Sequence, residues 1–62
     1  MFATALENKL LEEGQEMRLG AEKRMEIADI YEVLDALISA YGFSKEEILK
    51  IQEKKRAERG GF

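Results

Sequence analysis

Sixty-two residues make at most one small domain. A chain of this length buries only roughly 60% of its unfolded surface, so it usually needs a disulfide, a metal or a partner subunit. The sequence has no cysteine and no histidine, which excludes disulfides, the usual zinc sites and Ser–His or Cys–His catalysis. A metal held by carboxylates, an oligomer, or both remain available. The composition, 45% hydrophobic and 37% charged without proline, is typical of a helical protein.

Charge is distributed unevenly along the chain. Residues 1–44 hold nine acidic and four basic side chains, whereas residues 45–62 hold four acidic and six basic ones. The acidic part argues against binding of duplex nucleic acid, which favours a basic surface. The basic segment could meet the phosphates of a small ligand, or it could be a solvated helix end. No apolar run approaches the ~20 residues that span a bilayer and no signal-peptide pattern occurs, so we expect a cytoplasmic protein without a membrane partner.

Capping and turn signals predict the first two helices. Residues 4–7, Thr-Ala-Leu-Glu, have the form of a capping box and predict a helix from about residue 4 to residue 19. We expect Gly20 to stop that helix in the left-handed conformation. A second helix over about residues 21–41 is expected to end at Gly42.

A second capping box predicts the third helix. Residues 44–47, Ser-Lys-Glu-Glu, carry this motif, and Phe43 with Ile48 fits the hydrophobic staple around it. The helix is expected to run to about Glu58. No stretch shows the alternating pattern of a strand, so the sequence predicts an all-α fold in a single domain over residues 1–62.

The short connection between the first two helices predicts an antiparallel hairpin, with the third helix as a short addition. One short helix cannot cover both faces of such a hairpin. The second helix is apolar on two sides, one with Ile27, Tyr31, Leu34 and Ile38 and the other with Ile30, Val33, Leu37 and Ala40. A surface this wide predicts a homodimer or homotetramer in a four-helix-bundle arrangement. We expect both tyrosines, Tyr31 and Tyr41, to pack in the core of that bundle rather than against a base.

Acidic residues interrupt the apolar stripes of both long helices. At ~100° per residue, Glu13 lies near the centre of a stripe and Glu16 at its edge. The apolar members of that stripe are Phe2, Leu6, Leu10 and Met17. Glu26 falls on the stripe of the second helix that contains Val33, and Asp29 lies beside it. By contrast, the acids at positions 32 and 35 fall on the polar side.

Carboxylates that converge inside a bundle are unfavourable unless they are paired, protonated or bound to a metal. The basic residues of the two helices do not share the stripe centres; they are Lys9, Arg18, Lys23 and Arg24. A divalent cation is therefore the simplest compensation, and oxygen ligands select Mg²⁺, Mn²⁺ or Ca²⁺. The acids form two pairs with i, i+3 spacing, Glu13 with Glu16 and Glu26 with Asp29. On two antiparallel helices, both pairs would present their carboxylates to a shared ion. The alternative is that these acids lie on solvated helix faces, where such spacing is frequent.

The acids also carry a family resemblance. Residues 12–16, EEGQE, match the EExxE motif of the MazG-like all-α nucleotide pyrophosphohydrolases, and residues 26–29, EIAD, match the ExxD motif that follows it. The end of the chain, KKRAERGGF over residues 54–62, resembles the close of the branch labelled phosphoribosyl-ATP pyrophosphohydrolase-like. The resemblance covers nearly the whole chain.

This resemblance implies Mg²⁺-dependent hydrolysis, with Mn²⁺ as an alternative, of a nucleoside triphosphate to the monophosphate and pyrophosphate, as in nucleotide house-cleaning. The implied metal ligands are Glu13, Glu16, Glu26 and Asp29. The implied catalytic acid, which orients water, is Glu12. The basic residues that would bind the phosphates of the nucleotide substrate are Lys54, Lys55 and Arg59.

Two other functions remain open at this point. Relatives of this branch carry an N-terminal segment resembling KLVRDKIPEII that the 62 residues do not include. The substrate pocket could therefore be incomplete, or another subunit could supply the missing part. A shortened relative could bind metal and nucleotide with weak or no turnover, and the blandest alternative is a helical oligomer without a ligand.

Overall fold

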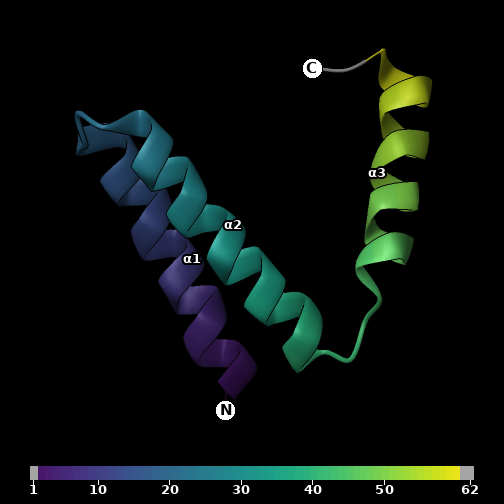
Figure 1. Cartoon of the computed structure of the whole chain (residues 1–62), viewed down its shortest axis with the longest axis horizontal. Coiled ribbons are helices and arrows are strands. Elements are labelled where there is room, and N and C mark those ends of the chain that lie inside the picture. Colours follow the sequence, from purple (N-terminus) through teal and green to yellow (C-terminus); the bar gives the residue numbers. More distant parts are fainter. Residues whose placement is uncertain (1, 61–62) are drawn as a thin grey trace.

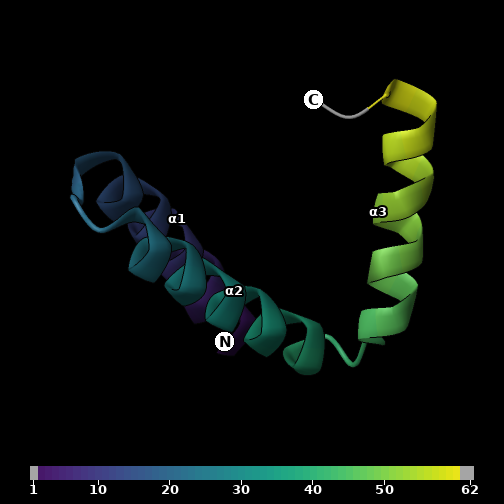
Figure 2. The same cartoon turned by 45° about the horizontal axis from the view of Figure 1, so that its top comes forward.

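The structure is a computed structural model and describes residues 2–60, apart from the side chain of Phe2. These residues form three helices, α1 (Phe2–Leu19), α2 (Lys23–Ala40) and α3 (Lys45–Arg59), and no strand. The prediction of an all-α fold is confirmed. Helices α1 and α2 lie side by side and antiparallel, whereas α3 stands apart from them (Figure 1, Figure 2). None of the helices in this part of the chain is long and apolar enough to cross a membrane.

The N-terminal capping box does not form. Helix α1 already includes Thr4, so this residue lies inside the helix and does not cap it. The carboxylate of Glu7 instead accepts a hydrogen bond from the hydroxyl of Tyr41. This bond ties the first turns of α1 to the end of α2. The motif therefore does not mark the start of the helix, which begins at Phe2, and Glu7 takes part in a tertiary contact.

The expected left-handed conformation of Gly20 is also wrong. Among the described residues, positive φ angles occur at other glycines, not at this one. The Gly20 amide donates to the carbonyl of Glu16 at 2.7 Å and so continues the helical hydrogen bonding for one more residue. The chain then turns, and Glu22 caps α2 by accepting from the amide of Arg24 at 3.2 Å. Helix α2 thus begins at Lys23 rather than near residue 21.

The link between α2 and α3 follows the prediction. Gly42 adopts a φ of 72°, and the amides of Gly42 and Phe43 donate to the carbonyls of Ser39 and Ile38 at 3.0 and 2.9 Å. This is a Schellman motif, in which glycine avoids the steric cost of the left-handed conformation. Ser44 then caps α3 with the expected capping box, because its hydroxyl accepts from the Glu47 amide at 3.3 Å. Helix α3 continues to Arg59, one residue beyond the expected end.

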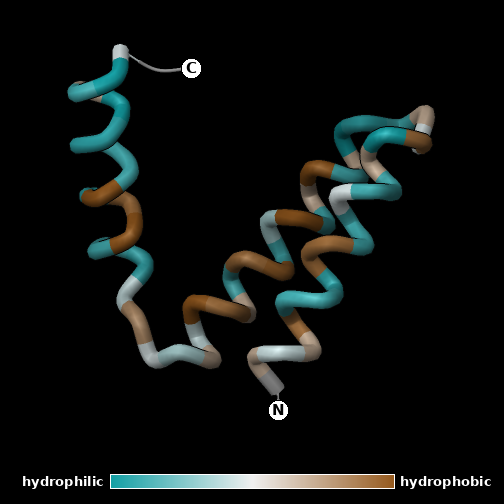
Figure 3. Tube along the Cα trace, turned by 180° about the vertical axis from the view of Figure 1, so that it is seen from behind, coloured by the Kyte–Doolittle hydropathy of each residue, from teal (hydrophilic) through white to brown (hydrophobic). Residues whose placement is uncertain are grey.

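The core of the chain is small and lies between α1 and α2. In the described residues, the buried positions are Val33 on α2, at 7% exposure, and Glu13 on α1, at 4%. The other apolar side of α2 is largely exposed: Ile27, Tyr31 and Leu34 are 43%, 63% and 39% exposed. Figure 3 shows the apolar residues as brown bands along the hairpin, while α3 is mostly hydrophilic. The two predicted apolar sides of α2 therefore differ, and only one is covered by α1.

The chain is also less compact than a folded domain of its size. Its radius of gyration is 13.2 Å. A compact chain of this length has a radius of gyration of roughly 10.6 Å. The difference comes from α3, which extends from the short link at residues 41–44 without packing along the hairpin (Figure 1).

Candidate metal centre

Three of the predicted metal ligands converge at the closed end of the hairpin. Glu13 and Glu16 lie one turn apart on α1, and Glu26 lies in the first turn of α2, just after the link between the helices. Because the helices are antiparallel, the start of α2 faces the last turns of α1. One carboxylate oxygen from each of the three lies within 4.8 Å of the other two. We call Glu13, Glu16 and Glu26 the acid cluster.

Glu13 is the buried member of the acid cluster. Its side chain is 6% exposed, and its Oε2 forms an ion pair with Lys9 Nζ at 3.0 Å. Its Oε1 is buried and accepts no hydrogen bond from the residues that the structure describes. Leaving a buried polar atom without a partner costs about 1–3 kcal/mol. A bound cation would supply the missing partner, so the donor set and the orphaned oxygen fit a hard divalent ion.

The electrostatics of the acid cluster favour added positive charge. The charge of Glu13 is the main cause that raises the pKa of Glu16, and burial adds to it. The hydrogen bond to Glu13 likewise raises the pKa of Lys9. Both pKa shifts are caused mainly by Glu13, because its negative charge favours a proton on each of these two neighbours.

Sequence reasoning missed Lys9 as a partner of Glu13. Its backbone lies away from the centre of the apolar stripe, but its long side chain can reach along the helix surface. The signal was present, because Lys9 stands four residues before Glu13 and side chains at this spacing are neighbours on a helix. Lys9 was expected to lie off the stripe centre, but its ammonium nevertheless compensates part of the charge of Glu13.

Asp29 and Glu12 are both exposed. Asp29 does not belong to the acid cluster, although it lies three residues beyond Glu26 on the same helix. Glu12 lies on α1 next to Glu13.

The three basic residues predicted to bind phosphate lie on α3. They are Lys54, Lys55 and Arg59, all of them exposed. Helix α3 stands apart from the closed end of the hairpin, where the acid cluster lies (Figure 1). One copy of the chain therefore does not bring the predicted cation ligands and the predicted phosphate ligands together.

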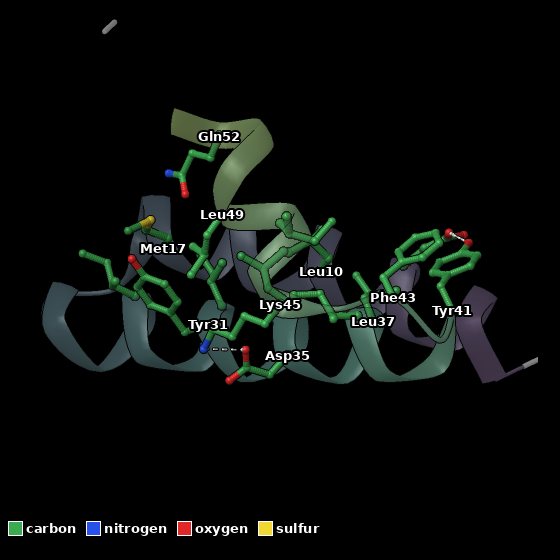
Figure 4. A pocket seen from close by; sticks show the side chains of 16 residues that line it. Leu10, Met17, Tyr31, Asp35, Leu37, Tyr41, Phe43, Lys45, Leu49 and Gln52 are labelled. Atoms are coloured by element: carbon green, nitrogen blue, oxygen red, sulfur yellow. Dashed lines mark hydrogen bonds and ion pairs between the residues drawn. The ribbon is translucent and has the colours of Figure 1, made fainter. Parts of the chain in front are cut away.

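A separate apolar groove of about 870 Å³ lies between the hairpin and α3 (Figure 4). Helix α2 contributes more of the lining residues than any other element, and Leu49 on α3 faces the hairpin residues across the groove. An ion pair of 3.3 Å between Lys45 and Asp35 lies at its edge. Tyr41 and Phe43 stack at one end, with ring centroids 5.4 Å apart. None of the three acids of the acid cluster lines this groove, so it is distinct from the candidate metal centre.

Comparisons of the chain with models of protein families, with curated proteins and with solved structures find no match. The chemistry open to the chain therefore follows from its own residues. Three converging carboxylates, one of them with a buried oxygen lacking a partner, can hold a hard cation. A cation held in this way can in turn bind the phosphate oxygens of a ligand.

Proposed function

We propose that the chain is a Mg²⁺-dependent nucleoside triphosphate pyrophosphohydrolase, able to use Mn²⁺, that releases the nucleoside monophosphate and pyrophosphate. The observation that carries the proposal is the acid cluster with the buried, unpartnered Oε1 of Glu13. The EExxE and ExxD motifs at residues 12–16 and 26–29 support it, because all three acids of the cluster belong to these motifs, which resemble those of the MazG-like family.

In this proposal the acid cluster and Asp29 would hold the ion. A bound Mg²⁺ would neutralise charge on the phosphates and lower the pKa of the attacking water. Glu12, exposed beside Glu13, orients the water that attacks the α-phosphorus and accepts its proton. The bond between that phosphorus and the α–β bridging oxygen breaks, and pyrophosphate leaves.

We also propose that the active form is a homodimer, or a homotetramer built from it. The single chain exposes 5447 Å². A compact protein of 7.1 kDa exposes roughly 4,100 Å², so the excess is roughly 1,300 Å². A standard interface buries about 800 Å² per partner. The excess exposed area of one chain is therefore large enough for such an interface. The exposed apolar residues of the groove supply the contact area, among them Ile27, Tyr31, Leu34 and Leu49.

Charge supports pairing between copies as well. The hairpin belongs to the acidic part of the chain, residues 1–44, and α3 belongs to the basic part, residues 45–62. A two-fold arrangement lets α3 of each copy lie on the hairpin of the other, because the same surfaces meet twice. Lys54, Lys55 and Arg59 then approach the acid cluster of the partner copy and bind the phosphates of its substrate.

The oligomeric state has a direct test. Sedimentation equilibrium is expected to give about twice the chain mass of 7.1 kDa or a higher multiple, and Leu34→Glu, which charges the groove, is expected to reduce it to the monomer mass. The matched control is Ile51→Glu on α3, because Ile51 is exposed but does not line the groove. A monomeric wild-type chain would contradict this part of the proposal.

The reaction is tested by pyrophosphate release from a panel of nucleoside triphosphates with Mg²⁺. We expect release by the wild-type chain, none with EDTA, and loss of activity in Glu13→Gln and Asp29→Asn. Glu32→Gln is the matched control, since Glu32 is an exposed acid of α2 outside the acid cluster. If no nucleotide yields pyrophosphate above the blank, the proposed reaction is wrong.

A second candidate is a module that binds metal and nucleotide without turnover. It is favoured by the separation, within one chain, of the basic residues of α3 from the acid cluster. It predicts that Mg²⁺ and nucleotide raise the melting temperature, since a ligand that binds only the folded form stabilises it, while no pyrophosphate appears. A helical oligomer without a ligand would show neither effect.

A further inference from the structure

The first residue after α1, Gly20, lies directly against two members of the acid cluster. A Cβ at this position would stand 2.5 Å from Glu26 Oε2 and 2.9 Å from the carbonyl oxygen of Glu16. Side chains do not approach one another this closely, so one of the atoms would have to move. The Glu26 carboxylate is the end of a flexible side chain and moves more easily than a helix carbonyl. A residue larger than glycine would therefore push Glu26 away.

Backbone conformation does not explain this glycine. Its φ is not in the left-handed region, and its amide makes a helical hydrogen bond to the carbonyl of Glu16. The φ angle at Gly20 is therefore open to other residues, although a Cβ here would also stand 2.9 Å from the carbonyl oxygen of Glu16. What glycine provides here is space, and Glu26 Oε2 occupies that space.

We propose that Gly20 is a positioning residue of the cation site, whose missing side chain lets the Glu26 carboxylate fold back over the end of α1 and join Glu13 and Glu16. The inference rests on the proposed metal site. Without this contact the ion keeps the two ligands of α1 and loses the one from the start of α2. Gly20 thus decides whether the site bridges the two helices or belongs to α1 alone.

The test is Mn²⁺ binding to the full 62-residue chain, followed by the electron paramagnetic resonance signal of free Mn²⁺. We expect Gly20→Ala to weaken binding by about tenfold or more, the size of effect seen when groups that orient metal ligands are removed. Gly14→Ala, within α1, is the matched control, because nothing lies within 4 Å of a Cβ added there. It should leave Mn²⁺ affinity unchanged.

A double-mutant cycle with Glu26→Ala separates positioning from a purely structural effect. If Gly20 acts through Glu26, Gly20→Ala costs no further Mn²⁺ affinity once Glu26 has been replaced. If Gly20→Ala alone does not fold, the inference requires the Gly20→Ala/Glu26→Ala chain to recover helical circular dichroism, since the side-chain clash is then gone. Failure of both chains to fold would place the clash at the Glu16 carbonyl and overturn the inference.

Two other results would also overturn the inference. These are wild-type affinity in Gly20→Ala and an equal loss of affinity with and without Glu26. By contrast, a wild-type chain that binds no Mn²⁺ contradicts the proposed metal site itself. The wild-type arm therefore distinguishes failure of the proposed function from failure of the role of Gly20.

Discussion

The hairpin and α3 are stabilised in opposite ways. The hairpin depends on contacts between residues far apart in the chain, such as the burial of Val33 and the hydrogen bond from Tyr41 to Glu7. Helix α3 has no buried residue and depends on local features, including the Ser44 capping box and arginines in its last turn. This difference indicates that a functional site is to be sought in the hairpin rather than in α3. Among the described residues, buried side chains occur in the hairpin and not in α3, and one of them is the carboxylate of Glu13.

The largest effect on stability is expected when a charge is placed in the interior of the hairpin rather than on the surface of α3. Val33→Asp places an unpaired charge between α1 and α2, and we expect the free energy of unfolding to fall by about 3 kcal/mol or more. In such a small chain this loss abolishes the helical circular dichroism of the hairpin. Ile51→Asp, at a 53% exposed position of α3, should change stability by less than about 0.5 kcal/mol. An equal loss of unfolding free energy in both variants would contradict the view that the hairpin has an interior and α3 does not.

A second prediction concerns Lys9, the exposed lysine of the hairpin that pairs with the buried Glu13. Lys9→Met removes the ammonium that pairs with Glu13, so the melting temperature in EDTA should fall. Mg²⁺ should raise the melting temperature of this variant more than that of the wild type, because the ion then supplies all of the compensating charge. Lys50→Met, an exposed lysine of α3, is the control and should melt like the wild type. A Mg²⁺ effect no larger than in the wild type would count against a cation at the acid cluster.

A third prediction tests whether α3 is stabilised by its own capping residues and not by the hairpin. Ser44→Ala removes the capping hydroxyl and should destabilise α3 by roughly 1 kcal/mol. Hydrogen exchange should then speed up at the amides of α3 while the amides of the hairpin keep their protection. Ser39→Ala, at an exposed position inside α2, is the matched control and should not speed up exchange in α3. Equal loss of protection in the hairpin would show that the two regions unfold as one unit.

The smallest effect is a pH dependence of the ion-free chain. The charge of Glu13 raises the pKa of Glu16, so the folded chain binds this proton more tightly than the unfolded chain does. Protonation therefore favours folding. The melting temperature in EDTA should rise as the pH falls from neutral towards the usual carboxyl pKa of about 4.3. Glu16→Gln should remove this rise, and an unchanged pH profile in that variant would rule out Glu16 as its source.

Local signals predicted local structure well. The Ser44 capping box and the glycine stop at Gly42 are both present, because each depends on residues a few positions apart. Thr4 and Gly20 failed for the opposite reason. The Thr4 motif lost Glu7 to Tyr41, which lies 34 residues away in the chain. A Cβ added at Gly20 would stand 2.5 Å from Glu26 Oε2, and no local pattern reveals this close approach.

The candidate site was predictable in part. Helical periodicity placed Glu13 on an apolar stripe, and the structure buries it there. Periodicity could not show how far a flexible side chain reaches, so it missed Lys9 as the partner of Glu13. Nor can it fix how two antiparallel helices slide along each other. That register brings Glu26 into the acid cluster and leaves Asp29 outside it.

The central claim is that the acid cluster holds a divalent cation, and the melting temperature with and without Mg²⁺ tests it most directly. We predict that Mg²⁺ raises the melting temperature of the wild-type chain in a concentration-dependent way. Glu13→Gln, which keeps the shape of the buried side chain but removes its charge, should lose this response. Identical wild-type curves in Mg²⁺ and in EDTA, or an equal rise in Glu13→Gln, would contradict the claim.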